Sequence, residues 1–162
     1  MDYLWSPWRY QYLTCPPKSS SCIFCVMAAD GHDEQNLIAY RGAHNFIVLN
    51  RFPYTSGHLM VVPFAHAAEL CRLDEAAATE MMALTRLAER RLRAIYRPEG
   101  LNIGMNIGES AGAGIAGHIH MHVLPRWHAD ANFMTTIAET RVLPEDLNVT
   151  WRRVRDAFTA AD

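Results

Sequence analysis

The sequence predicts an α+β fold in which a mostly antiparallel sheet packs against one long helix. One long amphipathic segment, residues 74–97, is preceded and followed by short apolar segments of strand length. Strands on both sides of a single long helix are typical of this fold class. The chain of 162 residues is half apolar, which is sufficient for one hydrophobic core. We therefore expect a single domain over residues 1–162.

The first part of the chain predicts an extended arm and three strands. Residues 1–20 are rich in Trp, Tyr and Pro, and the prolines exclude a long helix, so we expect an aromatic arm that docks on the domain or on a second subunit. Residues 37–40 and 45–49 are apolar segments around a turn that contains glycine, which predicts a β-hairpin. Residues 58–63 predict a third strand, which ends at a proline.

The long helix has start and stop signals. Asp74 is expected to cap its first turn, and Pro98 and Gly100 end it. Apolar side chains recur three and four residues apart, at Met81, Leu84, Ala88, Leu92 and Ile95. This face is expected to pack against the sheet.

The residues after the helix predict two more strands and a short C-terminal helix. Residues 101–107 alternate as a strand, and a glycine-rich loop at 108–114 leads into a second alternating segment at 118–122. Residues 145–160 predict a modest terminal helix within a C-terminal extension, residues 128–162. Together with the three earlier strands, this makes a five-stranded sheet.

Charge and composition exclude several classes of partner. The formal net charge is −2, from 15 Lys and Arg against 17 Asp and Glu, so duplex nucleic acid is not an expected partner, although single nucleotides are not excluded. No apolar run approaches the length of a membrane span, and the first residues lack a signal peptide pattern, so we expect a cytoplasmic protein without membrane contact. The four cysteines are too few and too unevenly placed for a disulfide framework.

Three histidines occupy alternate positions of the last predicted strand and therefore share one face. At a rise of about 3.3 Å per residue, His118 and His122 lie about 13 Å apart, too far for one metal ion to bind both directly. A His-x-His pair including His120 could bind zinc, or one imidazole could attack an electrophile while its neighbours orient it. A row of surface histidines is the plain alternative, but three of eight histidines on one strand face favour a functional role.

Two further motifs are ambiguous alone. Cys22-x-x-Cys25 fits half of a zinc knuckle, a redox pair or two buried thiols. The loop 108–114 has the small residues that let backbone N–H groups approach a phosphate, with the Ser110 hydroxyl as a further donor, but it also fits a plain connector.

Several motifs together resemble one family. Residues 118–124 have the form His-φ-His-φ-His-φ-φ, where φ is apolar, and with them the chain resembles the histidine triad superfamily of nucleotide hydrolases and transferases. Residues 50–63 are similar to the ribose-binding loop and following strand of the fragile histidine triad branch, and residues 106–112 to its phosphate loop. Residues 4–9 and 125–133 resemble a bacterial subgroup that includes diadenosine tetraphosphate phosphorylases.

The resemblance implies roles for individual residues. His120 would be the nucleophile that becomes nucleotidylated, held by the backbone carbonyl of His118, while His122 faces the phosphate oxygens and His58 supports the catalytic face. Asn50 would bind ribose. The implied phosphate-binding residues are Asn106, Gly108, Ser110, Gly112, Gly114 and His122.

The resemblance also implies a metal and a dimer. Cys22, Cys25, His66 and His118 match a closed Cys₂His₂ set, which would hold a structural zinc, against the alternative of reduced core cysteines. No organic cofactor is expected. The family pairs two protomers so that their sheets join, so a homodimer is implied. Residues 113–117 depart from the common loop pattern but match the phosphorylase-like subgroup, whose second-step acceptor is inorganic phosphate.

These observations favour an enzyme that acts at the α-phosphate of a dinucleoside polyphosphate, such as diadenosine tetraphosphate, through a covalent nucleotidyl-histidine. An adenosine phosphoramidate is the next substrate. A nucleotide-binding sensor with incidental turnover would need the same binding residues. A zinc-ribbon adaptor would explain only the two cysteines, and not the histidines beside a phosphate-type loop.

Overall fold

The computed structural model describes residues 21–128, 130 and 144–160. The predicted arm 1–20 lies outside these residues, and so do residues 129, 131–143 and 161–162 of the predicted extension. The strands are β1 (Ile38–Arg41), β2 (Asn45–Leu49), β3 (Leu59–Pro63), β4 (Gly100–Gly104) and β5 (Met121–Arg126). The helices are α2 (Ile23–Ala29), α3 (Asp33–Asn36), α4 (Glu75–Tyr96) and α6 (Leu147–Thr159), with 3₁₀ turns η1 (Leu70–Arg72) and η2 (Glu109–Ala111).

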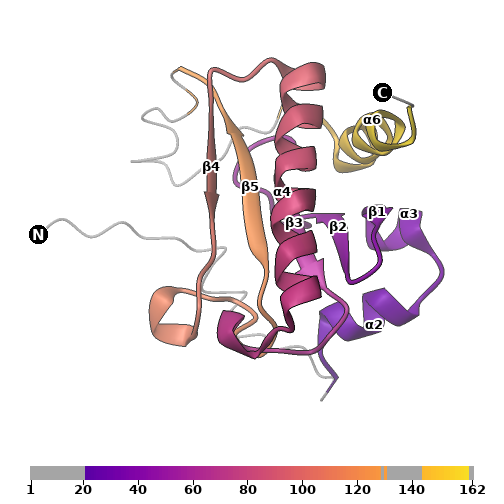
Figure 1. Cartoon of the computed structure of the whole chain (residues 1–162). Helices are drawn as coiled ribbons and strands as arrows, with labels where there is room; N and C mark the ends of the chain where they lie inside the picture. Colours follow the sequence, from indigo (N-terminus) through magenta and orange to yellow (C-terminus); the bar gives the residue numbers. More distant parts are fainter. Residues whose placement is uncertain (1–20, 129, 131–143, 161–162) are drawn as a thin grey trace, which may run out of the picture.

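The five strands form one antiparallel sheet, as the sequence predicts, and their order is β1-β2-β3-β5-β4 (Figure 1). The predicted hairpin is confirmed as β1 and β2, and Glu80 of α4 holds its turn. The Glu80 carboxylate accepts hydrogen bonds from the N–H groups of Ala43 and His44, both at 2.7 Å, and from the Asn45 amide at 2.9 Å. The turn is therefore fixed to the long helix, and not only to its own strands.

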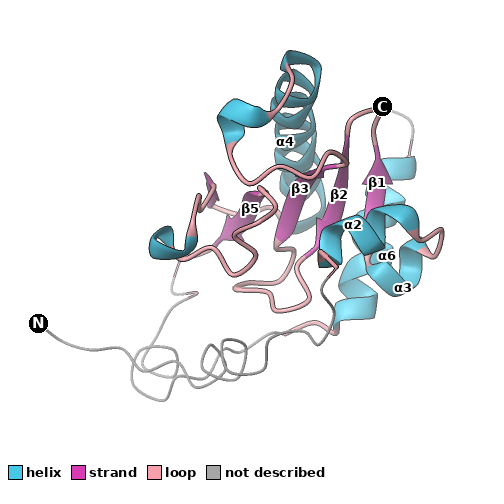
Figure 2. Ribbon diagram, turned by 90° about the horizontal axis from the view of Figure 1, so that it is seen from below, coloured by secondary structure: helices cyan, strands magenta, loops and turns pink. Residues whose placement is uncertain are grey.

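The two longest described helices begin at capping residues that the sequence contains. Asp74 caps α4 by accepting from the N–H of Ala77, and the apolar face of α4 is buried as predicted. Helix α6 begins at Leu147 after the cap Asp146, two residues later than predicted. It packs against α4 and β1. Figure 2 shows α2, α3 and α6 gathered around the β1 edge of the sheet.

The core lies between the sheet and α4. All residues of β2 and β3 are buried, which is expected for the central strands of a covered sheet. In the described part of the chain no helix has both the length and the apolar character that a membrane crossing requires.

Two strands differ from their predicted bounds. Strand β4 ends at Gly104, and β5 begins only at Met121, so of the three alternating histidines only His122 lies in the ladder. The reason is Pro63, which has no N–H group with which to continue the pairing of β3 with β5. The N–H of Ile119 instead donates to the carbonyl of Ala67 at 2.7 Å.

Candidate active site and metal centre

Three imidazoles gather where β5 begins. The ring centroids of His120 and His122 are 4.8 Å apart, and those of His122 and His58 are 5.0 Å apart. All three side chains are buried, with exposed fractions of 5%, 9% and 1% for His120, His122 and His58. The structure thus brings together the three residues that the resemblance assigns to catalysis.

The hydrogen bonding of His120 determines which nitrogen can attack. Its Nδ1 lies 2.9 Å from the backbone carbonyl oxygen of His118. A carbonyl oxygen only accepts, so Nδ1 carries the proton and Nε2 keeps a lone pair. Burial lowers the pKa of His120, and the bond to the His118 carbonyl acts in the opposite direction without reversing the shift. His120 is therefore a neutral imidazole with an unprotonated Nε2 near pH 7.

A chain of donors fixes the tautomers of the other two imidazoles. The N–H of Tyr54, which can only donate, lies 3.2 Å from His58 Nδ1. His58 Nε2 must then carry the proton, which it donates to His122 Nδ1 at 2.9 Å. His122 consequently carries its proton on Nε2, where it can serve as a hydrogen-bond donor. Burial, and to a smaller extent the charge of His120, lower the pKa of His122 to about 4.

Asn50 is built into the same chain of donors. Its Oδ1 accepts from the N–H of Phe52 at 3.0 Å, so its Nδ2 is the atom that lies 3.4 Å from His58 Nδ1. The residue predicted to bind ribose therefore lies beside the supporting histidine. Its contact with ribose stays a prediction.

The predicted phosphate loop is partly closed on itself. The N–H groups of Ala111 and Ala113 donate to the carbonyl of Gly108, and that of Gly112 donates to Glu109, at 2.8–3.3 Å. These N–H groups are engaged within the loop, whose Gly108 and Gly112 both have positive φ. Ser110 lies exposed in η2, Asn106 lies between β4 and η2, and Gly114 lies in the turn that follows. The contacts of these residues with phosphate stay predictions.

The structure also brings the four predicted metal ligands together. One ligand atom from each of Cys22, Cys25, His66 and His118 lies within 4.8 Å of the others. The Sγ of Cys22 lies 3.3 Å from His118 Nδ1, and that of Cys25 lies 3.3 Å from His66 Nδ1 and 3.6 Å from His118 Nδ1. Around a tetrahedral zinc ion, sulfur and nitrogen ligands would be about 3.6 Å apart. These four residues can hold a metal ion.

The Nε2 atom of His118 fixes the tautomer that metal binding through Nδ1 requires. Its Nε2 lies 2.9 Å from the carbonyl oxygen of Pro63, so Nε2 carries the proton and Nδ1 presents a lone pair to the cysteines. Burial raises the pKa of the Cys25 thiol, with Cys22 acting in the same direction. A divalent cation would offset this by stabilising the thiolates.

Comparison with known proteins gives the family to which the chain belongs. A family model described as the HIT domain matches residues 33–129. The chain is 40% identical over 159 residues to the AP-4-A phosphorylase of Mycobacterium tuberculosis, covering 94% of this chain and 82% of that protein. The chain belongs to the histidine triad (HIT) family.

Solved structures place the fold in the same family. A zinc-bound histidine triad protein from Mycobacterium smegmatis superposes with a TM-score of 0.68 at 28% identity, covering 85% of this chain and 92% of that one. A HIT family protein from Bacillus subtilis superposes with a TM-score of 0.61 at 28% identity, covering 88% and 99%. The predicted fold of this HIT protein is thereby confirmed.

Sequence reasoning missed Phe24, which joins the two sites of this HIT domain. Its ring centroid lies 5.4 Å from that of His118 and 5.2 Å from that of His120, and the side chain is buried. Phe24 stands between Cys22 and Cys25, two of the four candidate metal ligands. Only its position inside that motif could have suggested a contact with His120, because a phenylalanine in a short apolar segment is ordinarily a core residue.

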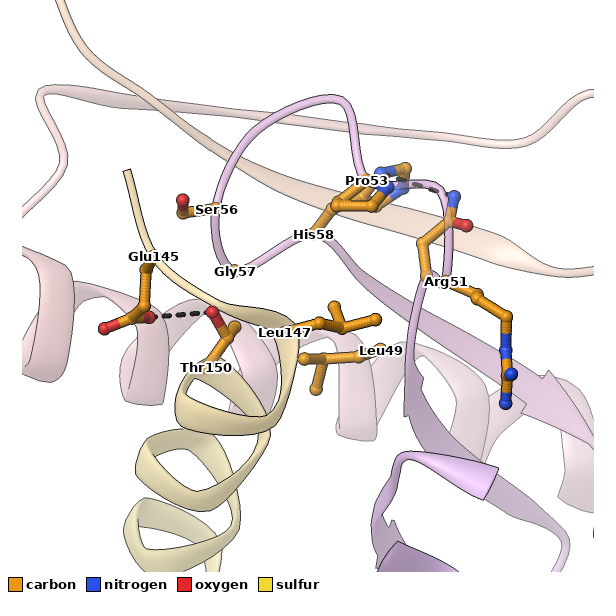
Figure 3. Close-up of a pocket in the computed structure, with 10 residues that line it drawn as sticks. Leu49, Arg51, Pro53, Ser56, Gly57, His58, Glu145, Leu147 and Thr150 are labelled. Carbon is orange, nitrogen blue, oxygen red and sulfur yellow. Dashed lines mark hydrogen bonds between the residues drawn. The ribbon is translucent and has the colours of Figure 1, made fainter. Parts of the chain in front are cut away.

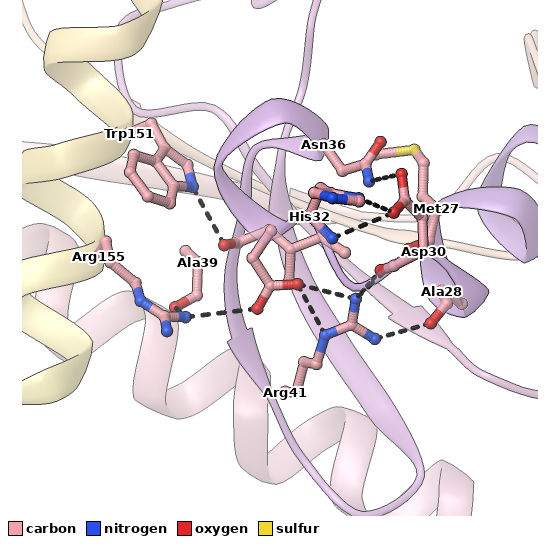
Figure 4. A network of polar contacts seen from close by, with 11 residues as sticks. Met27, Ala28, Asp30, His32, Asn36, Ala39, Arg41, Trp151 and Arg155 are labelled. Carbon is pink, nitrogen blue, oxygen red and sulfur yellow. Dashed lines mark hydrogen bonds and ion pairs between the residues drawn. The ribbon is translucent and has the colours of Figure 1, made fainter.

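The short helix α2 that carries Phe24 is anchored at its far end by Arg41 of β1. The guanidinium donates to the carbonyls of Ala28 at 2.8 Å and Asp30 at 2.9 Å, and its Nε donates to Asp33 at 2.9 Å (Figure 4). These bonds satisfy the carbonyls that a helix leaves open at its C-terminus. Helix α2 is thus held by Arg41 at one end, and its other end carries two of the four residues that can hold a metal ion.

A cavity of about 110 Å³ lies outside the catalytic cluster, between the loop 50–57 and the start of α6 (Figure 3). Leu49, Ser56 and Leu147 line it together with Glu145 and Thr150. Asn50 and His58 border it, but neither His120 nor His122 does. The cavity therefore adjoins the histidine cluster only at its His58 end.

Proposed function

We propose that this HIT protein transfers a nucleotidyl group from a dinucleoside polyphosphate, such as diadenosine tetraphosphate, to inorganic phosphate. The observation that carries the proposal is the neutral His120, whose Nδ1 is committed to the His118 carbonyl and whose Nε2 keeps its lone pair. Support for the substrate and for phosphate as the acceptor comes from the 40% identity to an AP-4-A phosphorylase.

The reaction takes two displacements at phosphorus. His120 Nε2 attacks the α-phosphorus, and the bond from that phosphorus to the bridging oxygen breaks with both electrons leaving on the nucleotide product. The resulting imidazolium keeps its proton on Nδ1, which donates it in a hydrogen bond to the His118 carbonyl oxygen. An oxygen of inorganic phosphate then attacks the same phosphorus and returns His120 to its neutral form. His122 Nε2–H donates to the phosphate oxygens as charge moves through them.

The remaining predicted residues would bind the substrate. Asn50 contacts the ribose with an amide hydrogen that His58 does not use. Asn106, Gly108, Ser110, Gly112 and Gly114 hold the phosphates beside His122, with the Ser110 hydroxyl as a donor since several loop N–H groups are already engaged.

The metal that the cysteine cluster would hold is zinc. Two sulfur and two nitrogen ligands at these spacings suit a closed tetrahedral site, and a similar histidine triad protein is zinc-bound. Such a site leaves no position for substrate. Its role is structural, since it would fix Phe24 and His118 beside the nucleophile.

A homodimer would join two sheets through β4. This edge strand is exposed at Asn102, Ile103 and Gly104, so its outer backbone groups can pair with a second copy. The opposite edge strand is covered, because Trp151 and Arg155 of α6 donate to the carbonyls of Ile38 and Ala39. The cytoplasmic location stays a prediction.

Product identification tests the reaction. With diadenosine tetraphosphate and inorganic phosphate, we expect ADP and ATP, whereas water as the acceptor would give AMP and ATP. We expect His120→Asn to lower turnover by more than about a thousandfold while leaving the thermal unfolding midpoint within a few degrees. His44→Asn, the same change at an exposed histidine of the β1–β2 turn, is the control. Equal turnover in both variants would exclude His120 as the nucleophile.

A further inference from the structure

The loop between β2 and β3 closes tightly over the catalytic histidines. The N–H of Asn50 donates to the carbonyl of His58 at 2.9 Å, and the N–H of His58 donates to Thr55 at 3.2 Å. The Thr55 hydroxyl donates to the carbonyl of Pro125 in β5 at 3.1 Å. The loop is therefore fixed both at its own base and to the strand that carries His122, so a side chain at its centre has a defined position.

Tyr54 stands at that centre, and its ring completes a triangle of rings. Its centroid lies 4.8 Å from that of His58, at an interplanar angle of 46°. It lies 6.2 Å from that of His122, at 27°. Tyr54 is 37% exposed, whereas the two histidines are almost fully buried. One side of the ring therefore covers the imidazoles while the rest of the residue meets solvent.

We propose that the side chain of Tyr54 is a positioning residue, which holds His58 and His122 in their paired orientation and keeps water from the hydrogen bond between them. The backbone of the same residue sets the tautomer of His58, so one residue controls both the proton positions and the ring positions of the pair. The consequence for turnover rests on the proposed function, but the consequence for the histidines does not.

The physical reason is the competition of water for both imidazoles. Water admitted to the pair could hydrogen-bond either nitrogen of each ring, which would favour the charged form and mix the tautomers. If His122 lost its proton on Nε2, it would present a lone pair to the phosphate oxygens and repel them. Of the described residues, the titratable side chains whose rings contact His122 are His58, His120 and Tyr54 itself, and β4 contributes only Gly104 opposite it.

The test compares Tyr54→Phe, which keeps the ring, with Tyr54→Leu, which removes it. Nuclear magnetic resonance of ¹⁵N-histidine in the full-length protein reports the tautomer and the pKa of each imidazole without substrate. We expect the phenylalanine variant to match the parent. In the leucine variant we expect the pKa of His122 to rise by about one unit and its tautomers to mix. If Tyr54→Leu does not fold, Tyr54→Met carries the same comparison, because methionine fills irregular spaces.

Kinetics give the second measurement. We expect Tyr54→Leu to lower kcat about tenfold and to change KM by less than about twofold. It should also move the acid limb of the pH profile to higher pH. Tyr54→Phe should keep the parent values of all three quantities. An unchanged titration and tautomer of His122 in the leucine variant would overturn the proposal. A higher KM with unchanged kcat and unchanged histidine spectra would also overturn it, because Tyr54 would then contact substrate instead. If the parent protein shows no turnover, the proposed function fails while the spectra still decide the role of Tyr54.

Discussion

His122 links the catalytic site to the stability of the fold through its proton. In the folded protein its pKa is about 4, because burial and the neighbouring His120 both disfavour the charged form, against an ordinary value of 6.5. Between these two values the unfolded chain binds the proton and the folded chain does not. The free energy of unfolding therefore rises with pH across this interval, and the contribution of His122 to it is lost as the pH falls from 6.5 toward 4.

We expect the His122 contribution to that loss to be on the order of 3 kcal/mol. Urea unfolding of the parent and of His122→Gln at pH values from 4.5 to 7.5 gives the free energy of unfolding of each protein as a function of pH. The difference between the two slopes of free energy against pH measures the contribution of His122. The glutamine keeps a polar side chain but cannot titrate, so its slope should be shallower. Parallel slopes would show that His122 is protonated equally in the folded and the unfolded chain.

The sequence predicted which histidines and cysteines form the two sites better than it predicted how their side chains are arranged. The spacing of the histidines and of the two cysteines indicated functional residues, because core packing alone rarely produces such patterns. Spacing alone could not separate His118, which turns to the cysteines, from His120 and His122, because strand periodicity sets only the face, and it was the family resemblance that separated them. Phe24 had only its place between the two cysteines as a signal, and Tyr54 had none, since a lone aromatic residue is indistinguishable from a core residue until its neighbours are known.

Gly57 determines how the loop 50–57 meets the long helix. Its φ is +77°, and a Cβ there would lie 2.9 Å from Cε2 of Tyr96 and 3.2 Å from Leu92. We expect Gly57→Ala to cost about 2 kcal/mol of stability, because the conformation is unfavourable and Tyr96 must move. Gly100→Ala in β4 is the control, since nothing lies within 4 Å of its Cβ position. Thermal unfolding measures both, and equal midpoints would contradict the expectation.

The elements that the sequence predicted are those with long, regular patterns. Helix α4 and the hairpin could be predicted because their apolar periodicity, capping residues and turn residues lie within the segments themselves. Helices α2 and α3 were not predicted, because segments of seven and four residues are too short to be stable alone and depend on tertiary partners such as Arg41. The start of β5 was placed too early, because the missing N–H of Pro63 acts on a strand distant in the sequence.

Across the whole molecule, the metal-ligand cluster joins segments that are far apart in the chain. Its ligands come from the start of α2, from the segment after β3 and from the approach to β5. Phe24 of α2 contacts both His118 and His120, so loss of a metal ion bound at this cluster should loosen Phe24 and His118 and thereby disturb His120. If the cluster binds a metal ion, the order of the catalytic site depends on a contact between the two halves of the chain.

We expect the purified protein to contain about one equivalent of zinc, and its removal by a chelator to lower the thermal unfolding midpoint by about 10 °C, because an ion bound only by the folded state adds its binding free energy to stability. Cys25→Ser should reproduce that loss and bind no zinc, whereas Cys71→Ser, at an exposed free cysteine, should retain both the metal and the midpoint. The metal content and the midpoint require no substrate, so they test the cluster separately from the reaction. Less than half an equivalent in every preparation, or a chelated protein with an unchanged midpoint, would mean that Cys22 and Cys25 are reduced core thiols and that α2 is held by packing alone.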